Sequence, residues 1–334
     1  MKNRQVVLAR VPDALPTAAD FDVRDVELPQ LSSGEVLCSN QILSLDPYVR
    51  SQMAGRHGVG NLALGDVING ETIATVIDSK NATIPVGTCV RCQGKWQEFC
   101  ILGENELVVQ SDAIKPASYG LSVLGMPGLT AFAGLNWLSS VSTGETVVVP
   151  AATGAVGATV VQLATKAGCR VIGVAGSDAK CDYAMNQLHV HACINRRKED
   201  VAERIKSLCP DGVDFYFDLV GGELLHLICA NLAVGARIIL CGLMAEYNSV
   251  KRSLGPMPGL LIASRAQMLG LVVYDFEDRR DEFIAACLPL VQQGELKMHE
   301  TSEYGLEQAP SLFCKLMNGD TTGKTLIYLD EDAQ

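Results

Sequence analysis

The sequence has few aromatic residues and a deficit of positive charge, and both scarcities narrow what the chain can do. Only 5% of its 334 residues are Phe, Trp or Tyr, whereas 48% are hydrophobic, a balance typical of a soluble α/β protein. The 27 Lys and Arg residues against 38 Asp and Glu leave a formal net charge of −11. Because nucleic acid and anionic membranes attract positive surfaces, we expect neither as a partner.

Long hydrophobic runs are also missing. No apolar run reaches the roughly 20 residues of a membrane-spanning helix. The N-terminal segment Met1–Gln5 leads into a short strand-like run, Val6–Leu8, and not into the apolar core of a signal peptide. We therefore expect a cytoplasmic protein with no membrane segment.

Twelve cysteines raise the question of disulfides or zinc, and their settings favour neither. Most lie inside apolar strands or helices, as free thiols do in reducing compartments. Only Cys89, Cys92 and Cys100 cluster in the sequence, whereas a structural zinc site usually needs four ligands. No metal site is therefore expected.

The segment from Val147 to Gly157 carries the strongest local signal. A β-branched run, Val147–Val149, leads into a small-residue turn with the spacing A-x-x-G-x-x-G, a variant of the dinucleotide fingerprint. A strand, a tight turn and a helix N-terminus together offer free backbone N–H groups and a favourable dipole to phosphate. We predict a phosphate-binding loop formed by Ala152, Thr153, Gly154, Ala155, Val156 and Gly157.

The residues after this loop favour a β-α-β unit over a Gly-rich turn without a ligand. An apolar stripe at 160–164 predicts a helix that Gly168 closes, and 170–175 predicts a second buried strand. Together they have the length of about 30 residues expected for such a unit. The motif therefore lies where phosphate binding requires it.

The end of the second predicted strand indicates which nicotinamide cofactor would bind. NAD enzymes usually place Asp or Glu there to hold the ribose hydroxyls. Here the turn is Gly176–Ser177, and Lys180 follows one helical turn later. A hydroxyl and a cation suit a 2′-phosphate, so we predict NADPH, although Lys180 could also be a solvated surface residue. Asp178 is either an acid that favours a helix N-terminus or a direct ribose ligand.

Two regions with different patterns predict two domains. Short strands punctuated by Gly and Pro run to about residue 120, which indicates a β-rich, barrel-like region. After it strands and helices alternate, as in a doubly wound parallel sheet. The last strand, 325–329, is expected to return to the first region. The predicted domains are therefore 1–120 with 300–334, and 121–299.

Individual elements of the second region can also be predicted. The apolar patterns indicate strands and helices in alternation, with one irregular stretch rich in Gly, Pro and Ser. The strands are expected at 192–194, 213–218, 236–242 and 267–273, the helices at 201–208, 224–232 and 281–293, and the irregular stretch from 243 to about 264.

Several separate motifs give the chain, nearly end to end, a resemblance to a known family. The matching segments are Ser44–Arg50 (S-x-D-P-Y-M-R), Leu124–Phe132 (L-G-M-P-G-L-T-A-Y, with Phe for Tyr), the loop Ala151–Gly157, Phe217–Gly222 (F-D-N-V-G-G, with Leu219 for Asn), and Cys241–Gly242 with Tyr247–Asn248. With them the chain resembles the medium-chain dehydrogenases/reductases, in particular the zinc-free branch of prostaglandin reductases, plant alkenal double-bond reductases and bacterial curcumin-reductase-like proteins. The resemblance implies a Rossmann doubly wound parallel sheet and a β-rich GroES-like barrel domain.

The same resemblance bears on the chemistry. Zinc-dependent members of the superfamily hold a catalytic metal with a Cys and a Gly-His-Glu trio. Here the matching stretch is Asn69–Gly70–Glu71, and the region around Asp46 lacks the Cys, so a catalytic zinc is not expected. The resemblance implies metal-free hydride transfer from NADPH to the β-carbon of an α,β-unsaturated ketone or aldehyde, with charge developing on the carbonyl oxygen.

The resemblance also assigns the residues that would line the substrate and the nicotinamide. Tyr48 and Tyr247 would line the substrate pocket, with the Tyr247 hydroxyl near the carbonyl or delivering a proton. For each tyrosine the other interpretation is a packing aromatic. Met126 and Thr130 would flank the nicotinamide, and Arg50 would orient the loop around Tyr48, through Asp46.

Further cofactor contacts follow from the same comparison of motifs. Cys241 and Gly242 belong to the cofactor loops, as does Tyr247. Arg196 replaces the Tyr that borders the adenosine phosphate in the branch, and is either a phosphate ligand or a surface charge. Thr321 replaces the Asn before the final Gly-Lys, and its hydroxyl can still form hydrogen bonds.

Other functions and the assembly remain to be weighed. The alternatives are an NADPH:quinone reductase of the neighbouring zinc-free branch and a non-enzymatic NADPH-binding protein. The D-P-Y-x-R segment favours the enone reductase over the first, and the preserved Tyr48, Tyr247 and cofactor loop disfavour the second. The resemblance implies a homodimer formed through edge strands such as 267–273. The identity of the enone is not readable from the sequence.

Overall fold

The computed structural model describes residues 1–58, 60–249 and 253–329. The chain divides into two units, one formed by Met1–Leu121 with His299–Gln334, and the other by Ser122–Met298. The first unit is built on a mostly antiparallel sheet, and the second on a parallel sheet with helices between its strands. The predicted class, a doubly wound parallel sheet with a separate β-rich part, is confirmed.

The first unit takes its form from strands with alternating burial. Along β3 (Glu35–Leu45), Val36, Cys38 and Asn40 point inward while the residues between them are more exposed. A sheet in the order β14-β15-β3-β4-β5-β7 surrounds β3, with β6 paired to it, and β1 and β2 form a separate antiparallel pair. The other strands are β1 (Lys2–Leu8), β2 (Phe21–Glu27), β4 (Thr72–Ser79), β5 (Cys89–Cys92), β6 (Phe99–Gly103), β7 (Leu107–Val109), β14 (Glu300–Tyr304) and β15 (Lys324–Tyr328).

The last strand of the chain pairs with an early strand in this unit. β15 lies antiparallel to β3, with Thr325 opposite Leu45, so the last strand returns to the first unit as expected. α1 (Val49–Met53) follows β3, and α9 (Ala309–Asn318) precedes β15. Phe313 of α9 contacts Trp96 edge-on, with ring centroids 5.5 Å apart. Burial of these rings ties the C-terminal segment to the N-terminal strands.

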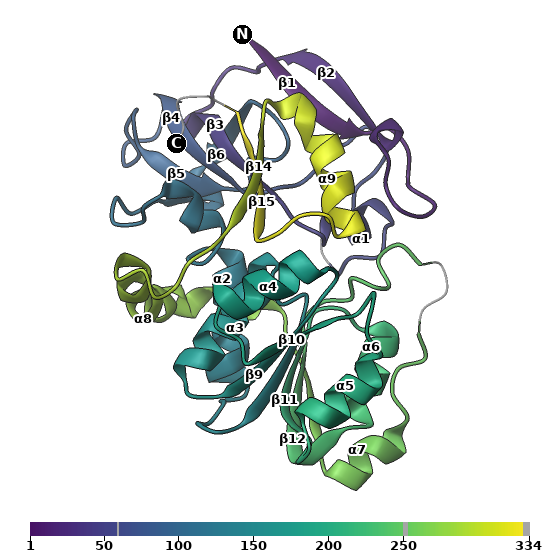
Figure 1. The fold of residues 1–334 in the computed structure, drawn as a ribbon. Coiled ribbons are helices and arrows are strands. Elements are labelled where there is room, and N and C mark those ends of the chain that lie inside the picture. Colours follow the sequence, from purple (N-terminus) through teal and green to yellow (C-terminus); the bar gives the residue numbers. More distant parts are fainter. Residues whose placement is uncertain (59, 250–252, 330–334) are drawn as a thin grey trace. The chain divides into compact units, whose positions relative to one another are not determined.

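The second unit contains six parallel strands in the order β10-β9-β8-β11-β12-β13. Right-handed crossovers place α3 and α4 on one face of the sheet and α5, α6 and α7 on the other (Figure 1). The strands are β8 (Thr146–Pro150), β9 (Arg170–Ala175), β10 (Ala192–Asn195), β11 (Val213–Asp218), β12 (Leu232–Leu240) and β13 (Gln267–Gly270). The helices are α2 (Met126–Ala133), α3 (Ala155–Lys166), α4 (Asp178–Asn186), α5 (Val201–Leu208), α6 (Gly222–Cys229), α7 (Pro258–Ser264) and α8 (Arg280–Gln292).

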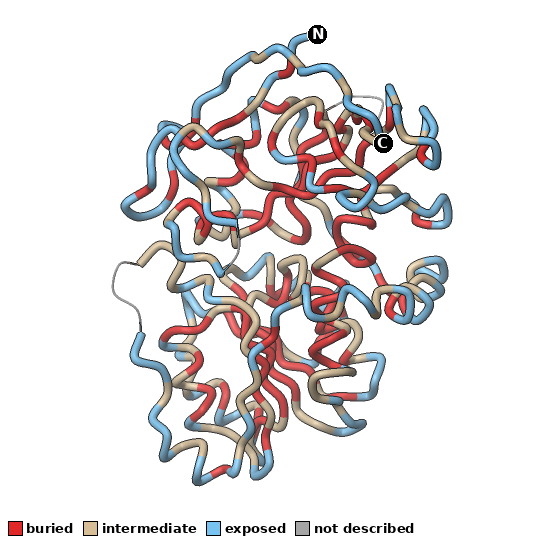
Figure 2. Tube along the Cα trace, turned by 180° about the vertical axis from the view of Figure 1, so that it is seen from behind, coloured by how far each residue is buried: buried red, intermediate tan, exposed pale blue. Residues whose placement is uncertain are grey.

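Burial on both faces explains why the central strands read as continuous apolar runs. Val147, Val148 and Val149 are fully buried, and Figure 2 shows the central strands as the most buried part of this unit. The strand order reverses between β8 and β11, so the loops after these strands diverge there. Ligands of open α/β sheets bind at such a point.

Three predicted elements of the second unit differ in the structure. The helix expected at 224–232 is α6, which ends at Cys229, and β12 begins at Leu232. The stretch 243–264, expected to be irregular, contains α7, because Pro258 occupies the first helical turn, where a missing N–H costs nothing. The last strand ends at Gly270, not at 273, and a 3-10 helix spans Val273–Arg279.

One further property concerns membranes. Of the helices in the described ranges, none combines the length and the apolar character needed to cross a bilayer.

Candidate active site

The predicted phosphate loop forms the start of α3. Gly154 is the N-cap of this helix and has no side chain to bond the first N–H groups. The N–H groups of a first helical turn have no acceptor inside the helix, so they are available to an anion. Ala152 and Thr153 are buried beneath the turn, and the residues at 154–156 are partly exposed. The loop therefore has the form that phosphate binding needs.

Close backbone contacts explain the glycines of this loop. A Cβ at Gly157 would lie 2.2 Å from the carbonyl oxygen of Ala151, which itself has a φ of +47°. A Cβ at Gly173 of β9 would lie 2.9 Å from the Ala152 Cβ. Because side chains would fill this space, only glycine lets the turn rest directly on the helix and the next strand. The cradle that results fits a pyrophosphate.

The turn after β9 begins α4, and Ser177 caps that helix. The Ser177 Oγ accepts a hydrogen bond from the Lys180 N–H at 3.3 Å. Gly176 precedes it and is half-buried. Ser177 therefore holds the helix N-terminus in place, and its hydroxyl proton remains able to donate to a ligand.

Asp178, the acid that could have bound a ribose, already has partners. Its exposed carboxylate forms an ion pair with Lys198 and accepts a hydrogen bond from Asn195 Nδ2 at 2.6 Å. The Lys198 ammonium and then the Asn195 amide hold the pKa of Asp178 below its ordinary value. Asp178 thus lies in the first turn of α4 with its charge balanced from the end of β10.

Two arginines lie over the same turn. A Cβ at Gly176 would be 3.9 Å from Arg196 Nη2 and 3.7 Å from Arg197 Nε. The Arg196 N–H bonds to the Ala175 carbonyl at 3.0 Å, which joins the ends of β9 and β10. Arg196, predicted as a phosphate ligand or a surface charge, therefore lies beside the turn that carries Ser177, and Arg197 lies there too. Arg197 was not predicted, although a second arginine directly after a predicted strand end was a usable signal.

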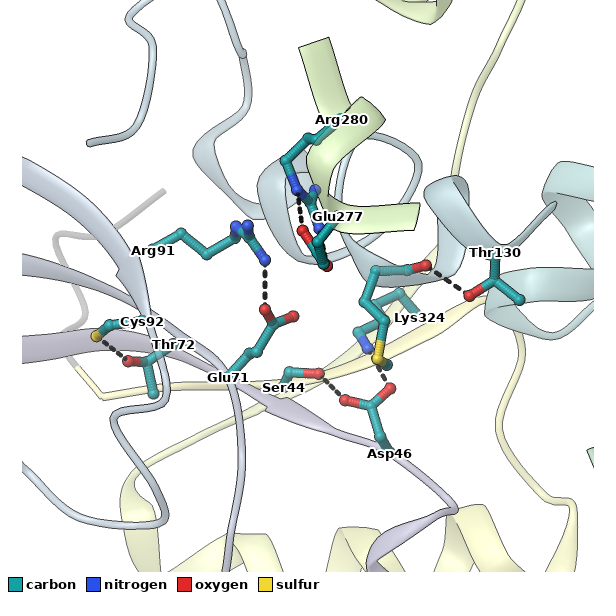
Figure 3. Close-up of polar contacts among 11 residues, drawn as sticks. Ser44, Asp46, Glu71, Thr72, Arg91, Cys92, Thr130, Glu277, Arg280 and Lys324 are labelled. Carbon is teal, nitrogen blue, oxygen red and sulfur yellow. Dashed lines mark hydrogen bonds and ion pairs between the residues drawn. The ribbon is translucent and has the colours of Figure 1, made fainter. Parts of the chain in front are cut away.

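The residues expected beside the nicotinamide lie on α2. Thr130 is buried, and its Oγ1 donates to the Met126 carbonyl at 2.8 Å (Figure 3). A hydroxyl has one proton, so Thr130 can offer only lone pairs to a further partner. A carboxamide N–H₂ is the kind of group that such an acceptor binds.

The turn after β12 carries Cys241, Gly242 and Tyr247. The N–H groups of Cys241 and Gly242 donate to the Asp218 carbonyl at 3.0 and 3.1 Å, which fixes this turn against the end of β11. The Asp218 carboxyl is buried, which raises its pKa, and its Oδ1 accepts from the Tyr216 hydroxyl at 3.0 Å. Burial also raises the pKa of the Tyr247 phenol. Tyr247 is therefore a neutral donor at physiological pH.

In the first unit a buried ion pair supports the segment that carries Tyr48. Lys324 Nζ lies 2.6 Å from Asp46 Oδ1, with the two side chains 1% and 8% exposed, and Ser44 donates to the other carboxylate oxygen (Figure 3). Asp46 comes directly after β3 and two residues before Tyr48, and Lys324 begins β15. A charge out of water is stable only with such a partner.

Thr321 lies three residues before Lys324, in the loop between α9 and β15. Its side chain is buried, and its Oγ1 accepts a hydrogen bond from Thr325 Oγ1 at 3.2 Å. The Thr321 proton is thus available for another acceptor. One ion pair therefore supports both site residues that the sequence placed in this unit.

The stretch that resembles the zinc-binding trio has a different use here. Glu71 forms a buried ion pair with Arg91 of β5, and Thr72 contacts Cys92 (Figure 3). Within the ranges that the structure describes, no group of three or more His, Cys, Asp or Glu side chains is placed to hold a metal ion. Glu71 therefore has a structural role in the sheet, where the Arg91 guanidinium neutralises its charge.

The expected link from Arg50 to Tyr48 through Asp46 takes another form. Arg50 is fully buried and donates from Nη2 to the carbonyls of Pro12 and Ala14, at 2.8 and 2.9 Å. Asp46 is bound by Ser44 and Lys324. Arg50 therefore anchors α1 to the N-terminal segment, because its Nη2 donates to two carbonyl oxygens of that segment.

Known proteins are similar to this chain over nearly its whole length. Residues 4–109 match a family described as the N-terminal domain of oxidoreductase, and residues 155–292 match one described as zinc-binding dehydrogenase. The NADPH-dependent curcumin reductase of Escherichia coli is 35% identical over 99% of this chain and 98% of its own length. The NADP-dependent 2-alkenal reductase of Nicotiana tabacum is 32% identical over 99% of each chain.

A solved structure is also similar. The CurA protein of Vibrio vulnificus, in complex with NADPH, is 36% identical, with a TM-score of 0.93 over 98% of this chain and 99% of its own. At 36% identity the two chains are similar in sequence as well as in fold.

The buried pair in the first unit leads to a test of stability. Lys324→Met leaves the Asp46 carboxylate buried without its partner, so we expect a loss of about 3–5 kcal/mol in the free energy of unfolding, measured by urea denaturation. Lys315→Met is the matched control, because Lys315 pairs with Glu303 on the surface and is expected to cost under about 1 kcal/mol. Equal losses in the two variants would contradict the role given to the Asp46–Lys324 pair.

The cations around Gly176 lead to a test of cofactor choice. Lys180→Ala and Arg197→Ala each remove a charge that would contact a 2′-phosphate, so NADPH affinity should fall about 10- to 100-fold while NADH affinity stays unchanged. Binding is measured by the change in nicotinamide fluorescence. Lys206→Ala, an exposed cation on α5, is the control and should alter neither affinity. Equal loss for NADPH and NADH would refute the 2′-phosphate assignment.

Proposed function

Because the chain belongs to the zinc-independent branch of the medium-chain dehydrogenases/reductases that contains curcumin, prostaglandin and 2-alkenal reductases, we propose that it reduces the carbon–carbon double bond of α,β-unsaturated ketones and aldehydes with NADPH. The observation that carries the proposal is the cation-lined turn at Gly176, in the same unit as the N-terminus of α3, which has no side-chain cap. The cations at the turn and the free N–H groups of the helix N-terminus can both bind phosphate groups.

The residues of the second unit fit this cofactor. The loop 152–157 would hold the pyrophosphate, and Gly176, Ser177, Lys180, Arg196 and Arg197 would surround the 2′-phosphate. Bound NADPH supplies the hydride that the β-carbon of the substrate receives. Met126, Thr130, Cys241 and Gly242 would hold the nicotinamide end. Thr321 would supply the cofactor hydrogen bond that the resemblance assigns to it. The predicted domains take their roles from this assignment: 121–299 binds NADP, and 1–120 with 300–334 binds substrate.

The two tyrosines would act on the substrate. We assign to Tyr247 a hydrogen bond to the enone oxygen, where negative charge develops as the β-carbon is reduced. A phenol with a raised pKa keeps its proton and so stays a donor. Tyr48 would form a wall of the substrate site and fix the orientation of the enone. Such positioning is a large part of catalysis where no metal polarises the carbonyl.

The assembly and the compartment complete the proposal. A homodimer through β13 is supported by its place at the edge of the parallel sheet and by exposed apolar residues near it, namely Leu254, Met257, Ile262, Val272 and Tyr274. Sedimentation at equilibrium distinguishes the dimer from a monomer. A cytoplasmic location is supported by twelve cysteines that are all free. Alkylation of the protein as the cells are lysed would reveal any disulfide.

The function is tested with a panel of substrates. The wild-type protein should oxidise NADPH in the presence of enones, alkenals or curcumin, with a saturated carbonyl compound as product. Deuteride from labelled NADPH should appear at the β-carbon, as identified by NMR. An allylic alcohol as product would contradict reduction of the C=C bond. Faster turnover of quinones would favour the quinone reductase, and folded protein without any turnover would favour a non-enzymatic role.

The role of Tyr247 gives a pH-dependent prediction. Tyr247→Phe removes only the hydroxyl, so kcat should fall about 10- to 100-fold while the Kd of NADPH changes little. Deprotonation would also remove the donor. Because burial raises the pKa of Tyr247 above its ordinary value of 10.0, the wild-type pH profile should show no alkaline loss from this group below that pH. The surface residue Tyr304 provides the control, and Tyr304→Phe should retain full activity.

A further inference from the structure

The ring of His57 lies beside the ring of Tyr48 in the first unit. The two rings are 5.4 Å apart between centroids and tilted by 34°, which is a packed arrangement. Both residues are half-buried. Tyr48 comes directly before α1 and His57 shortly after its end, so this short helix brings the two rings together.

A chain of hydrogen bonds joins the same two residues through α1. Ser51 Oγ lies 2.8 Å from the Tyr48 carbonyl oxygen and 2.9 Å from His57 Nδ1. A serine hydroxyl has one proton, and a carbonyl can only accept. Ser51 therefore donates to Tyr48 and accepts from the Nδ1–H of His57. The backbone N–H of His57 donates to Asn61 Oδ1 at 3.0 Å, which adds a second hydrogen bond that holds the histidine.

The state of the ring agrees with this arrangement. Burial lowers the pKa of His57, so the uncharged ring is favoured near neutral pH. With Nδ1 protonated, the neutral ring presents its face to Tyr48 and its N–H to Ser51. His57 therefore contacts the ring of Tyr48 directly and holds the Tyr48 carbonyl through Ser51.

We propose that His57 is a positioning residue for the reduction, because it fixes the ring of Tyr48 directly and its backbone through Ser51. The proposal rests on the proposed function, in which Tyr48 meets the enone. A side chain held at two points has fewer orientations, and a substrate wall that shifts by about 1 Å can cost a factor of about 100 in rate. His57 touches neither the substrate nor the cofactor in this assignment.

Kinetics of three His57 variants test the proposal. His57→Ala removes the ring and the N–H, so kcat/KM for an enone should fall about tenfold while the Kd of NADPH stays unchanged. His57→Phe keeps the ring, and His57→Asn keeps a donor near the position of Nδ1, so each should restore part of the loss. Ser51→Ala should have a smaller effect of the same kind. Ser311→Ala breaks an equivalent hydroxyl-to-carbonyl bond in α9 and should have no effect.

A double substitution separates positioning from a general structural effect. If His57 acts through Tyr48, His57→Ala should cause no further loss of kcat/KM in a Tyr48→Ala protein. Additive losses, or an unchanged kcat/KM in His57→Ala alone, would overturn the proposal.

A measurement that needs no turnover tests the positioning of Tyr48 separately from the proposed function. In protein labelled with 3-fluorotyrosine, the ¹⁹F resonance of Tyr48 is assigned by its loss in Tyr48→Phe. It should be a single narrow line in the wild type and in His57→Phe, and broadened by exchange in His57→Ala. An equally narrow line in His57→Ala would refute the positioning role. A narrow-to-broad change in a protein that turns over no enone would refute only the proposed function.

Discussion

The buried ion pair between Asp46 and Lys324 is the interaction on which the first unit depends. These residues lie near opposite ends of the chain, and each carries a charge into a place where water cannot solvate it. Neither charge is stable there alone, so the ion pair favours the pairing of β15 with β3. The same pair fixes the turn that leads to Tyr48 and the loop that carries Thr321. The pair therefore contributes to the stability of this unit and to the geometry of the candidate site.

In the second unit, several positively charged side chains lie at one turn without being buried. Parallel strands bring all their carboxyl ends to the same edge, so the turns after β9 and β10 meet there. Lys180, Arg196 and Arg197 gather at this edge. Asp178 would oppose an anion at the same place, but its ion pair with Lys198 reduces that repulsion. In the proposed function, the preference of this turn for a phosphate would come from the balance of charges among its side chains and not from burial.

Local patterns predicted much of the second unit, and long-range contacts were beyond them. The unit β8-α3-β9 was readable because its strand, turn and helix signals are contiguous in the sequence. The helix α7 was not, because the Gly and Pro residues before it resemble a loop, and the turn between α6 and β12 has no strong breaker. The Asp46–Lys324 and Glu71–Arg91 pairs join residues that only the folded sheet brings together. Arg197 was missed because the motif comparison pointed to Arg196 alone, although Arg197 follows the same predicted strand end.

Several thiols of the chain bear on the proposed function, because a reductase of electrophilic alkenes would expose its own cysteines to them. The thiolate is the form of cysteine that attacks such compounds, so a raised pKa and burial both protect it. Burial raises the pKa of Cys209 and Cys229 to about 11, and that of Cys241 and Cys287 to about 12. Cys241 is the informative case, since it lies in the turn that would hold the nicotinamide end of the cofactor. A thiol kept protonated there would react slowly with an electrophilic alkene bound at the proposed site.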